Sequence, residues 1–175
     1  MLVLFGIVLF AGWKSGLSAF SLWWYAAYLV GFVVIIAFVR AIMAHRMKTN
    51  WDISDRKKRI IPLLILACIF AVNSFAVSMF GSIQLVVFHL IWFIWLIGLL
   101  LITLKMKISG HMSVLTLACG ILLRWYGTQV LPIFLLIPVL GWSRIVLKRH
   151  TLSEVIGGFL YSVIILYISH FFLSY

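Results

Sequence analysis

Residues 143–154 lie between two apolar segments and hold an arginine, a histidine and one of only three acidic residues in the chain. His150 and Glu154 are four residues apart, so on a helix that begins near Thr151 their side chains share one face. A carboxylate that accepts the proton of one imidazole nitrogen fixes the tautomer and leaves the other nitrogen available as a nucleophile. Arg144, six residues before His150, carries a guanidinium suited to binding a phosphate. The alternative interpretation is a basic cluster that only anchors a helix at the lipid headgroups.

A second group of reactive side chains stands where another apolar segment begins and consists of Ser109, Gly110 and His111. The N-terminus of a helix offers unpaired backbone N–H groups and the positive end of the helix dipole, which together bind anions. Glycine lets an oxyanion approach the backbone closely, and Ser109 can both cap the helix and donate a hydroxyl. The alternative is an ordinary serine cap followed by a histidine at the membrane boundary.

A third group lies earlier in the chain, where Asp55 is followed by four consecutive basic residues. Such a run at a membrane edge usually sets topology or attracts lipid headgroups. If it reaches the same membrane face as the two histidines, it also supplies candidate phosphate ligands, namely Arg56, Lys57 and Arg59. The three groups together would then contribute several cations, a helix N-terminus, two imidazoles and an orienting carboxylate.

The elements that must position these groups are membrane helices. The chain has 175 residues, of which 66% are hydrophobic and 10% charged, and no soluble core of this size needs so many apolar residues. Its eight tryptophans are expected as anchors at two membrane interfaces. The net charge of +11 indicates anionic headgroups or an anionic substrate rather than nucleic acid. Cys68 and Cys119 lie inside apolar runs and are expected to be packing residues.

We therefore predict an all-α, polytopic membrane bundle that forms a single domain over residues 1–175. A short interfacial or half-inserted helix is expected within residues 1–18, followed by a six-helix core over 19–175. The predicted spans are, in order, 19–39, 60–80, 83–104, 110–127, 129–143 and 153–174. Counting the crossings puts three charged connections on one membrane face, namely 45–59, 105–111 and 143–154. The three groups of reactive side chains are thus expected to converge there, while the oligomeric state is left open.

The three groups, in this order, resemble the signatures of the type-2 phosphatidic acid phosphatase superfamily. That family contains membrane lipid phosphatases and soluble vanadium haloperoxidases. Its third signature reads Ser-Arg, five residues, His, three residues, Asp. The chain matches it with the spacing intact and with glutamate in place of aspartate, at Ser143, Arg144, His150 and Glu154.

The other two signatures of the family match less completely. The second, Pro-Ser-Gly-His, has Ile108 where proline is usual and is otherwise matched by Ser109, Gly110 and His111. The first reads Lys, six residues, Arg-Pro. Around Arg59 it is a poor match, because Asp52 stands where the lysine would be and the proline comes three residues after the arginine. The resemblance covers roughly residues 48–160.

The resemblance implies a phosphatase that works through a phosphohistidine. His150 would attack the phosphorus, Glu154 would orient His150, and His111 would protonate the leaving oxygen and then activate water. The phosphoryl oxygens would be held by Arg144, Ser109, the Gly110 N–H and one or more of Arg56, Lys57 and Arg59. No metal and no cofactor is expected, because two separated histidines and one glutamate do not make a metal cage.

The expected substrate is a lipid phosphate monoester or pyrophosphate, because the site would open at headgroup depth beside lipid-facing helices. Candidates are a polyprenyl pyrophosphate, phosphatidylglycerol phosphate, phosphatidic acid and the phosphate of lipid A. Two alternatives remain: a lipid phosphotransferase with the same intermediate, and a non-catalytic lipid-binding or lipid-flipping protein with a degenerate site. Positive-inside counting puts the charged face in the cytoplasm. The resemblance puts it at the periplasmic face of a bacterial inner membrane, and we follow the resemblance because most of these cations have a catalytic use.

Overall fold

The structure, a computed structural model, describes residues 19–47, 55–80 and 83–172, and every regular element within those ranges is helical. The predicted all-α class is therefore confirmed. The predicted N-terminal segment, 1–18, lies outside the described residues. The chain divides into two compact units, Met1–Leu100 and Leu101–Tyr175. Each unit is described by itself, and the single catalytic domain over the whole chain stays a prediction.

Four helical stretches are long and apolar enough to cross a membrane, namely Arg56–Met79, Leu85–Lys105, Gly110–Val146 and Leu152–Phe171. A shorter apolar stretch, Trp23–Val39, precedes them. Many large apolar side chains on these helices are exposed, as expected of surfaces that face lipid. The chain is therefore membrane-embedded by length and composition, but the six predicted spans are not confirmed.

The first unit contains α2 (Ala19–Met47), α3 (Arg56–Phe80) and most of α4 (Ile83–Lys105). Helix α3 begins four residues before the predicted span, because the Asp55 carboxylate accepts a hydrogen bond from the backbone N–H of Lys57 at 3.0 Å and caps the helix. The basic run therefore forms the first turn of α3. Pro62 lies inside the helix.

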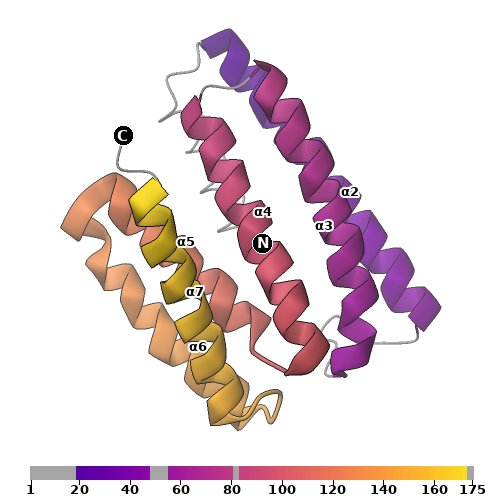
Figure 1. Cartoon of the computed structure of the whole chain (residues 1–175), viewed down its shortest axis with the longest axis vertical. Coiled ribbons are helices and arrows are strands. Elements are labelled where there is room, and N and C mark those ends of the chain that lie inside the picture. Colours follow the sequence, from indigo (N-terminus) through magenta and orange to yellow (C-terminus); the bar gives the residue numbers. More distant parts are fainter. Residues whose placement is uncertain (1–18, 48–54, 81–82, 173–175) are drawn as a thin grey trace. The chain divides into compact units, whose positions relative to one another are not determined.

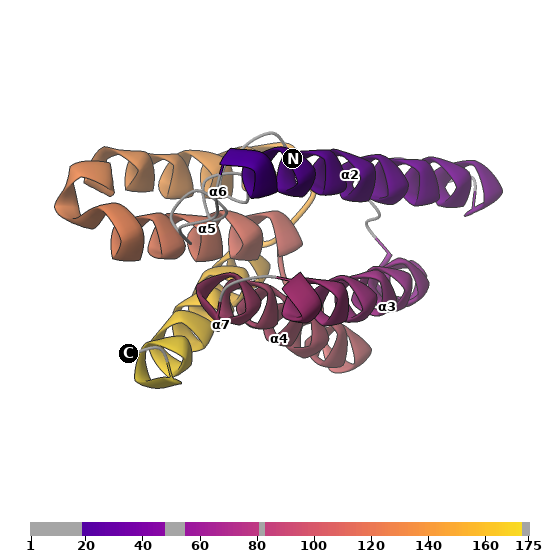
Figure 2. The same ribbon diagram turned by 90° about the horizontal axis from the view of Figure 1, so that it is seen from above.

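The second unit contains the end of α4, then α5 (Gly110–Tyr126), the 3-10 helix η1 (Gly127–Leu135), α6 (Leu136–Val146) and α7 (Leu152–Phe172). The segment predicted as one span at 129–143 is divided between the 3-10 helix η1 and the α-helix α6. Gly127 adopts φ +69°, which ends α5, and Pro132 cannot donate a backbone hydrogen bond within η1. As a result α6 starts later than predicted, and α5 and α6 lie side by side, joined by η1 at one end (Figure 2).

Helix α5 packs against α7 along most of its length, and α6 also contacts α7 (Figure 1). Small residues allow the close approach. A Cβ atom at Gly120 would overlap with the Leu166 side chain, and one at Gly158 would overlap with the backbone carbonyl of Ser109. Two buried serines link the helices, because the Ser162 hydroxyl donates to the Ser113 carbonyl at 2.7 Å and the two hydroxyls are 2.6 Å apart. The apolar core beside them contains Met112, Cys119, Ile137 and Val155.

Candidate active site

Helix α7 begins with a capping box formed by Thr151 and Glu154. The Thr151 hydroxyl accepts a hydrogen bond from the Glu154 N–H at 3.3 Å, and the Glu154 carboxylate accepts one from the Thr151 N–H at 3.4 Å. This reciprocal pairing satisfies two backbone donors at the start of the helix. It also fixes the Glu154 side chain, because the carboxylate must fold back toward the N-terminus of α7 to complete it.

The folded-back carboxylate of Glu154 meets the imidazole of His150. The Nδ1–H of His150 donates to Glu154 Oε2 at 2.7 Å, which confirms the contact predicted from their spacing. The His150 side chain is 1% exposed and that of Glu154 is 16% exposed. Because Nδ1 carries the proton, Nε2 holds the lone pair when the ring is neutral. The pair can therefore present a neutral, oriented nitrogen nucleophile.

The loop from Arg144 to His150 is held by a Schellman motif at the end of α6. The Lys148 N–H donates to the Ile145 carbonyl at 2.9 Å, and the Arg149 N–H donates to the Arg144 carbonyl at 3.0 Å. The His150 N–H also reaches that Arg144 carbonyl, at 3.3 Å. Lys148 occupies the left-handed position of the motif with φ +52°, where glycine is usual. The backbones of Arg144 and His150 are thus joined by a hydrogen bond.

The start of α5 is joined directly to the start of α7. The Ser109 N–H donates to the Glu154 carbonyl at 2.8 Å, across a separation of 45 residues in the chain. Gly158, one turn further along α7, leaves room for the Ser109 carbonyl, which a larger residue would displace. The group that contains His150 and Glu154 and the group that contains Ser109, Gly110 and His111 therefore meet in one place, as predicted. The third group, the basic run at the start of α3, belongs to the other unit.

Ser109 caps α5, as predicted, since its hydroxyl accepts a hydrogen bond from the Met112 N–H at 3.4 Å. Its side chain is fully buried. The second role predicted for Ser109, donation to a phosphoryl oxygen, stays a prediction. Gly110 and His111 form the first turn of α5, where Gly110 is half-buried and His111 exposed. The catalytic role of His111 stays a prediction as well.

Lys107 reaches the same carboxylate from the connection between α4 and α5. Its ammonium lies 3.1 Å from Glu154 Oε2 and donates to the Arg149 carbonyl at 3.3 Å. Its side chain is 27% exposed. One carboxylate oxygen therefore accepts from both an imidazole and an ammonium, which come from different parts of the chain.

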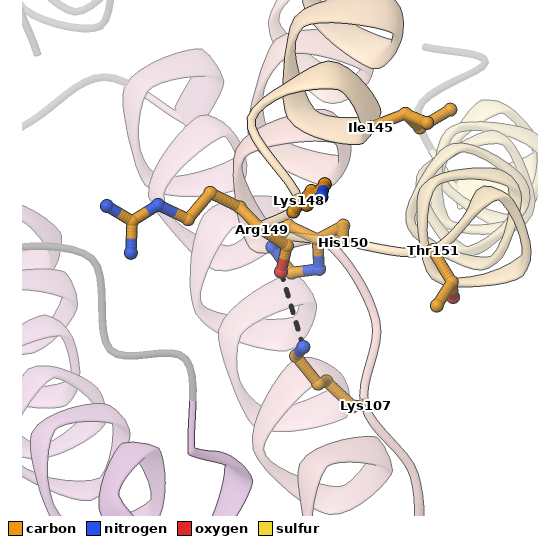
Figure 3. Close-up of a pocket in the computed structure, with 6 residues that line it drawn as sticks. All are labelled: Lys107, Ile145, Lys148, Arg149, His150 and Thr151. Atoms are coloured by element: carbon orange, nitrogen blue, oxygen red, sulfur yellow. Dashed lines mark hydrogen bonds between the residues drawn. The ribbon is translucent and has the colours of Figure 1, made fainter.

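A pocket of about 290 Å³ opens beside this cluster. Figure 3 shows Lys107 extending toward the Arg149 carbonyl, with the His150 ring next to it. Three cations, one imidazole, one hydroxyl and one apolar side chain line the pocket: Lys107, Lys148, Arg149, His150, Thr151 and Ile145. Such a lining suits an anionic group attached to an apolar body.

The remaining predicted phosphate ligands are Arg56, Lys57 and Arg59, which lie in the first turn of α3 in the first unit, so their part in the site stays a prediction. Asp52 lies outside the described residues. Within the described ranges, no three side chains among histidine, cysteine, aspartate and glutamate gather as they would around a metal ion. That no metal is needed stays a prediction.

Five residues that line the pocket were not predicted from the sequence: Lys107, Ile145, Lys148, Arg149 and Thr151. Thr151 had a visible signal, because Thr-x-x-Glu before an apolar run is the pattern of a capping box. Lys107 and Lys148 looked like ordinary juxtamembrane cations, and only the folded loops bring them to the His150–Glu154 pair.

Comparison of the chain with protein-family models, with curated proteins and with solved structures found no match. The family resemblance therefore depends on the signature residues themselves.

Proposed function

We propose that this chain is a metal-independent lipid phosphatase that hydrolyses a lipid phosphate monoester or pyrophosphate through a phosphohistidine. The observation that carries the proposal is the 2.7 Å contact between His150 Nδ1 and Glu154, next to a cation-lined pocket. An imidazole that a carboxylate holds in one tautomer can act as a nucleophile. A pocket lined by lysine and arginine suits a phosphate group. The resemblance to type-2 phosphatidic acid phosphatases, which rests on the same residues, supports the same chemistry.

In the first step of the proposed reaction, Nε2 of His150 attacks the phosphorus and the bond to the leaving oxygen breaks. His111 gives its proton to that oxygen, so that the lipid leaves as an alcohol or as a lipid monophosphate. In the second step His111 takes a proton from water, the water oxygen bonds to phosphorus, and the bond to His150 breaks. Inorganic phosphate leaves, and both imidazoles return to their starting state.

The positive groups around His150 would stabilise the charge that spreads over the phosphoryl oxygens during transfer. Arg144 is the arginine of the matched signature, and its carbonyl accepts a hydrogen bond from the His150 N–H. Lys148 and Arg149 line the pocket and would hold further oxygens of the headgroup. The N–H of Gly110, the hydroxyl of Ser109 and the cations of α3 complete the proposed set, which consists of Ser109, Gly110, Arg56, Lys57 and Arg59.

The proposed setting is a bilayer spanned six times, with α5 and the η1–α6 segment as two short spans. The site then opens at the headgroups on the periplasmic face of a bacterial inner membrane. A cysteine at position 148, in a Cys68→Ser background, tests the sidedness in intact cells. Labelling by a membrane-impermeant maleimide supports the periplasmic face, and labelling only after lysis places the site in the cytoplasm.

Two other functions use the same residues. A lipid phosphotransferase would pass the phosphoryl group from His150 to a second lipid instead of water, so phosphate release would depend on an acceptor. A lipid-binding or lipid-flipping protein would bind the headgroup without turnover.

The decisive test is phosphate release by the purified protein from a panel of lipid phosphates in the presence of EDTA. We expect turnover that survives EDTA and is inhibited by vanadate, an analogue of the pentacoordinate phosphorus. His150→Ala and His111→Ala should each remove most of the turnover. The matched control is His170→Ala, which replaces an exposed histidine in the last turn of α7 and should keep the turnover of the parent protein. Full activity of His150→Ala protein would overturn the proposal.

A further inference from the structure

Glu154 Oε2 accepts hydrogen bonds from two side chains that come from different parts of the chain. It lies 2.7 Å from Nδ1 of His150 and 3.1 Å from the ammonium of Lys107. We propose that Lys107 is a positioning residue that holds the Glu154 carboxylate against His150 and keeps His150 in its neutral, nucleophilic form. This inference rests on the proposed function, because it assigns His150 the role of nucleophile.

The backbone on both sides of Lys107 is fixed, which gives its side chain a defined direction. The Met106 N–H donates to the Ile102 carbonyl at 2.8 Å, and the Ser109 N–H donates to the Glu154 carbonyl at 2.8 Å. Ile108 between them is 5% exposed and packs against α7, since a Cβ at Gly157 would lie 3.0 Å from its Cγ2. Lys107 therefore projects toward Glu154 from a short, well-anchored connection.

The ammonium also ties the loop that carries His150. Its hydrogen bond to the Arg149 carbonyl, at 3.3 Å, reaches the residue immediately before His150. Lys107 thus contacts the orienting carboxylate and the backbone next to the nucleophile at the same time. Loss of its side chain would release both.

The charge of Lys107 acts on the protonation of His150. A carboxylate alone beside an imidazole favours the imidazolium, which has no lone pair on Nε2. An ammonium on the same carboxylate oxygen compensates the negative charge, so that a proton on Nε2 would add an uncompensated positive charge. The neutral ring should therefore persist to lower pH with Lys107 than without it.

Charged side chains reach His150 from several elements of this unit. Glu154 on α7 accepts its Nδ1–H, and Lys107, Lys148 and Arg149 line the same pocket as His150, while Arg144 of α6 is joined to it through the backbone. Lys107 contacts the Glu154 carboxylate directly, at 3.1 Å. The positive charges of Lys148 and Arg149 also disfavour the imidazolium, so removal of Lys107 should reduce the effect and not abolish it.

The test replaces Lys107 with neutral residues and follows His150 directly. The chain has five histidines, so ring signals of ¹⁵N-histidine-labelled protein in detergent can be assigned with single histidine variants. In Lys107→Met the midpoint of the His150 titration should move to higher pH. The midpoint should also move to higher pH in Lys107→Gln, because glutamine can donate a hydrogen bond but carries no charge. Lys107→Arg should stay near the parent, and Lys105→Met, an exposed lysine two residues earlier, should not shift.

The pH–rate profile of phosphate release supplies the second readout. In Lys107→Met and Lys107→Gln the acidic limb of the profile should move to higher pH, by the same amount as the midpoint of the His150 titration. A shifted titration in a protein without turnover would show that Lys107 acts on the protonation of His150, but it would overturn the proposed function and with it the role of His150 as nucleophile. Turnover with an unshifted titration in folded Lys107→Met and Lys107→Gln proteins would overturn the inference and leave the proposed function standing. Unchanged His170 signals show that a variant is folded.

Discussion

Replacing Glu154 with aspartate, the residue that is usual in the resembled family, should damage this protein. Aspartate is shorter by one carbon–carbon bond, about 1.5 Å. With the backbone of α7 in place, the 2.7 Å contact between His150 Nδ1 and the carboxylate would lengthen to roughly 4 Å, beyond hydrogen-bond range. The contacts of the same oxygen with Lys107 and with the Thr151 N–H, at 3.1 and 3.4 Å, would be lost with it.

The expected cost of this change can be estimated from the displacement. A misplacement of about 1 Å in a catalytic group costs about 10²-fold in rate, which corresponds to about 2.7 kcal/mol of transition-state stabilisation. Loss of the capping box should lower the free energy of unfolding by about 1 kcal/mol. We expect kcat/KM for phosphate release from a lipid phosphate to fall about 10²-fold in Glu154→Asp.

The assay compares Glu154→Asp with Glu154→Gln, which keeps the length and removes the charge. Thermal unfolding in detergent shows whether each variant is folded. Glu154→Gln should retain more of the helix cap but lose the ion pair with Lys107. Parent-like kcat/KM in Glu154→Asp would refute the reasoning, because it would mean that the reach of the glutamate is not what orients His150.

Three further predictions follow from the packing of the site. Lys148→Asn removes the cation but tolerates the left-handed backbone, so it should raise KM several-fold with little change in unfolding temperature. Lys148→Val cannot adopt that backbone without strain and should lower the free energy of unfolding by about 1–2 kcal/mol. Equal unfolding temperatures of the two variants would contradict this. Gly158→Ala should destabilise the protein by about 1–3 kcal/mol and reduce activity, because its Cβ would overlap with the Ser109 carbonyl. Gly157→Ala, whose Cβ would lie 3.0 Å from Ile108 Cγ2, should cost less in the same thermal unfolding assay. Ser162→Ala should lower stability by about 1 kcal/mol without changing kcat, as thermal unfolding and phosphate release will show.

Much of the helical framework could be predicted from the sequence, because apolar runs of membrane length leave few alternatives to a helix. The start of α5 at Gly110 and the extent of α7 agree with the predicted segments to within one or two residues. The start of α3 was predicted too late, because the basic first turn looked like a connection and the capping by Asp55 was not considered. The division of the segment 129–143 between η1 and α6 was not predicted, because Pro132 and the positive φ of Gly127 set the backbone locally.

The site was predictable where it depended on spacing within one helix. The four-residue separation of His150 and Glu154 gave the contact directly. The roles of the lysines were harder to predict, because a lysine near a membrane edge has the same sequence context whether it binds lipid headgroups or a carboxylate. Lys107 became part of the site only through the backbone bond between Ser109 and Glu154, a tertiary contact over 45 residues that local patterns do not encode.

The central claim is that His150 carries the phosphoryl group, and the most direct measurement is to trap it there. An activated substrate such as 4-nitrophenyl phosphate, whose leaving group needs no proton, should still phosphorylate His111→Ala protein, while the missing base slows hydrolysis of the intermediate. Acid-labile, base-stable phosphate should then accumulate on the peptide that contains residue 150, and mass spectrometry can locate it. We expect stoichiometric label on His150 in His111→Ala and none in the double variant with His150→Ala. Label on another residue, or turnover of lipid phosphate by folded His150→Ala protein, would contradict the account.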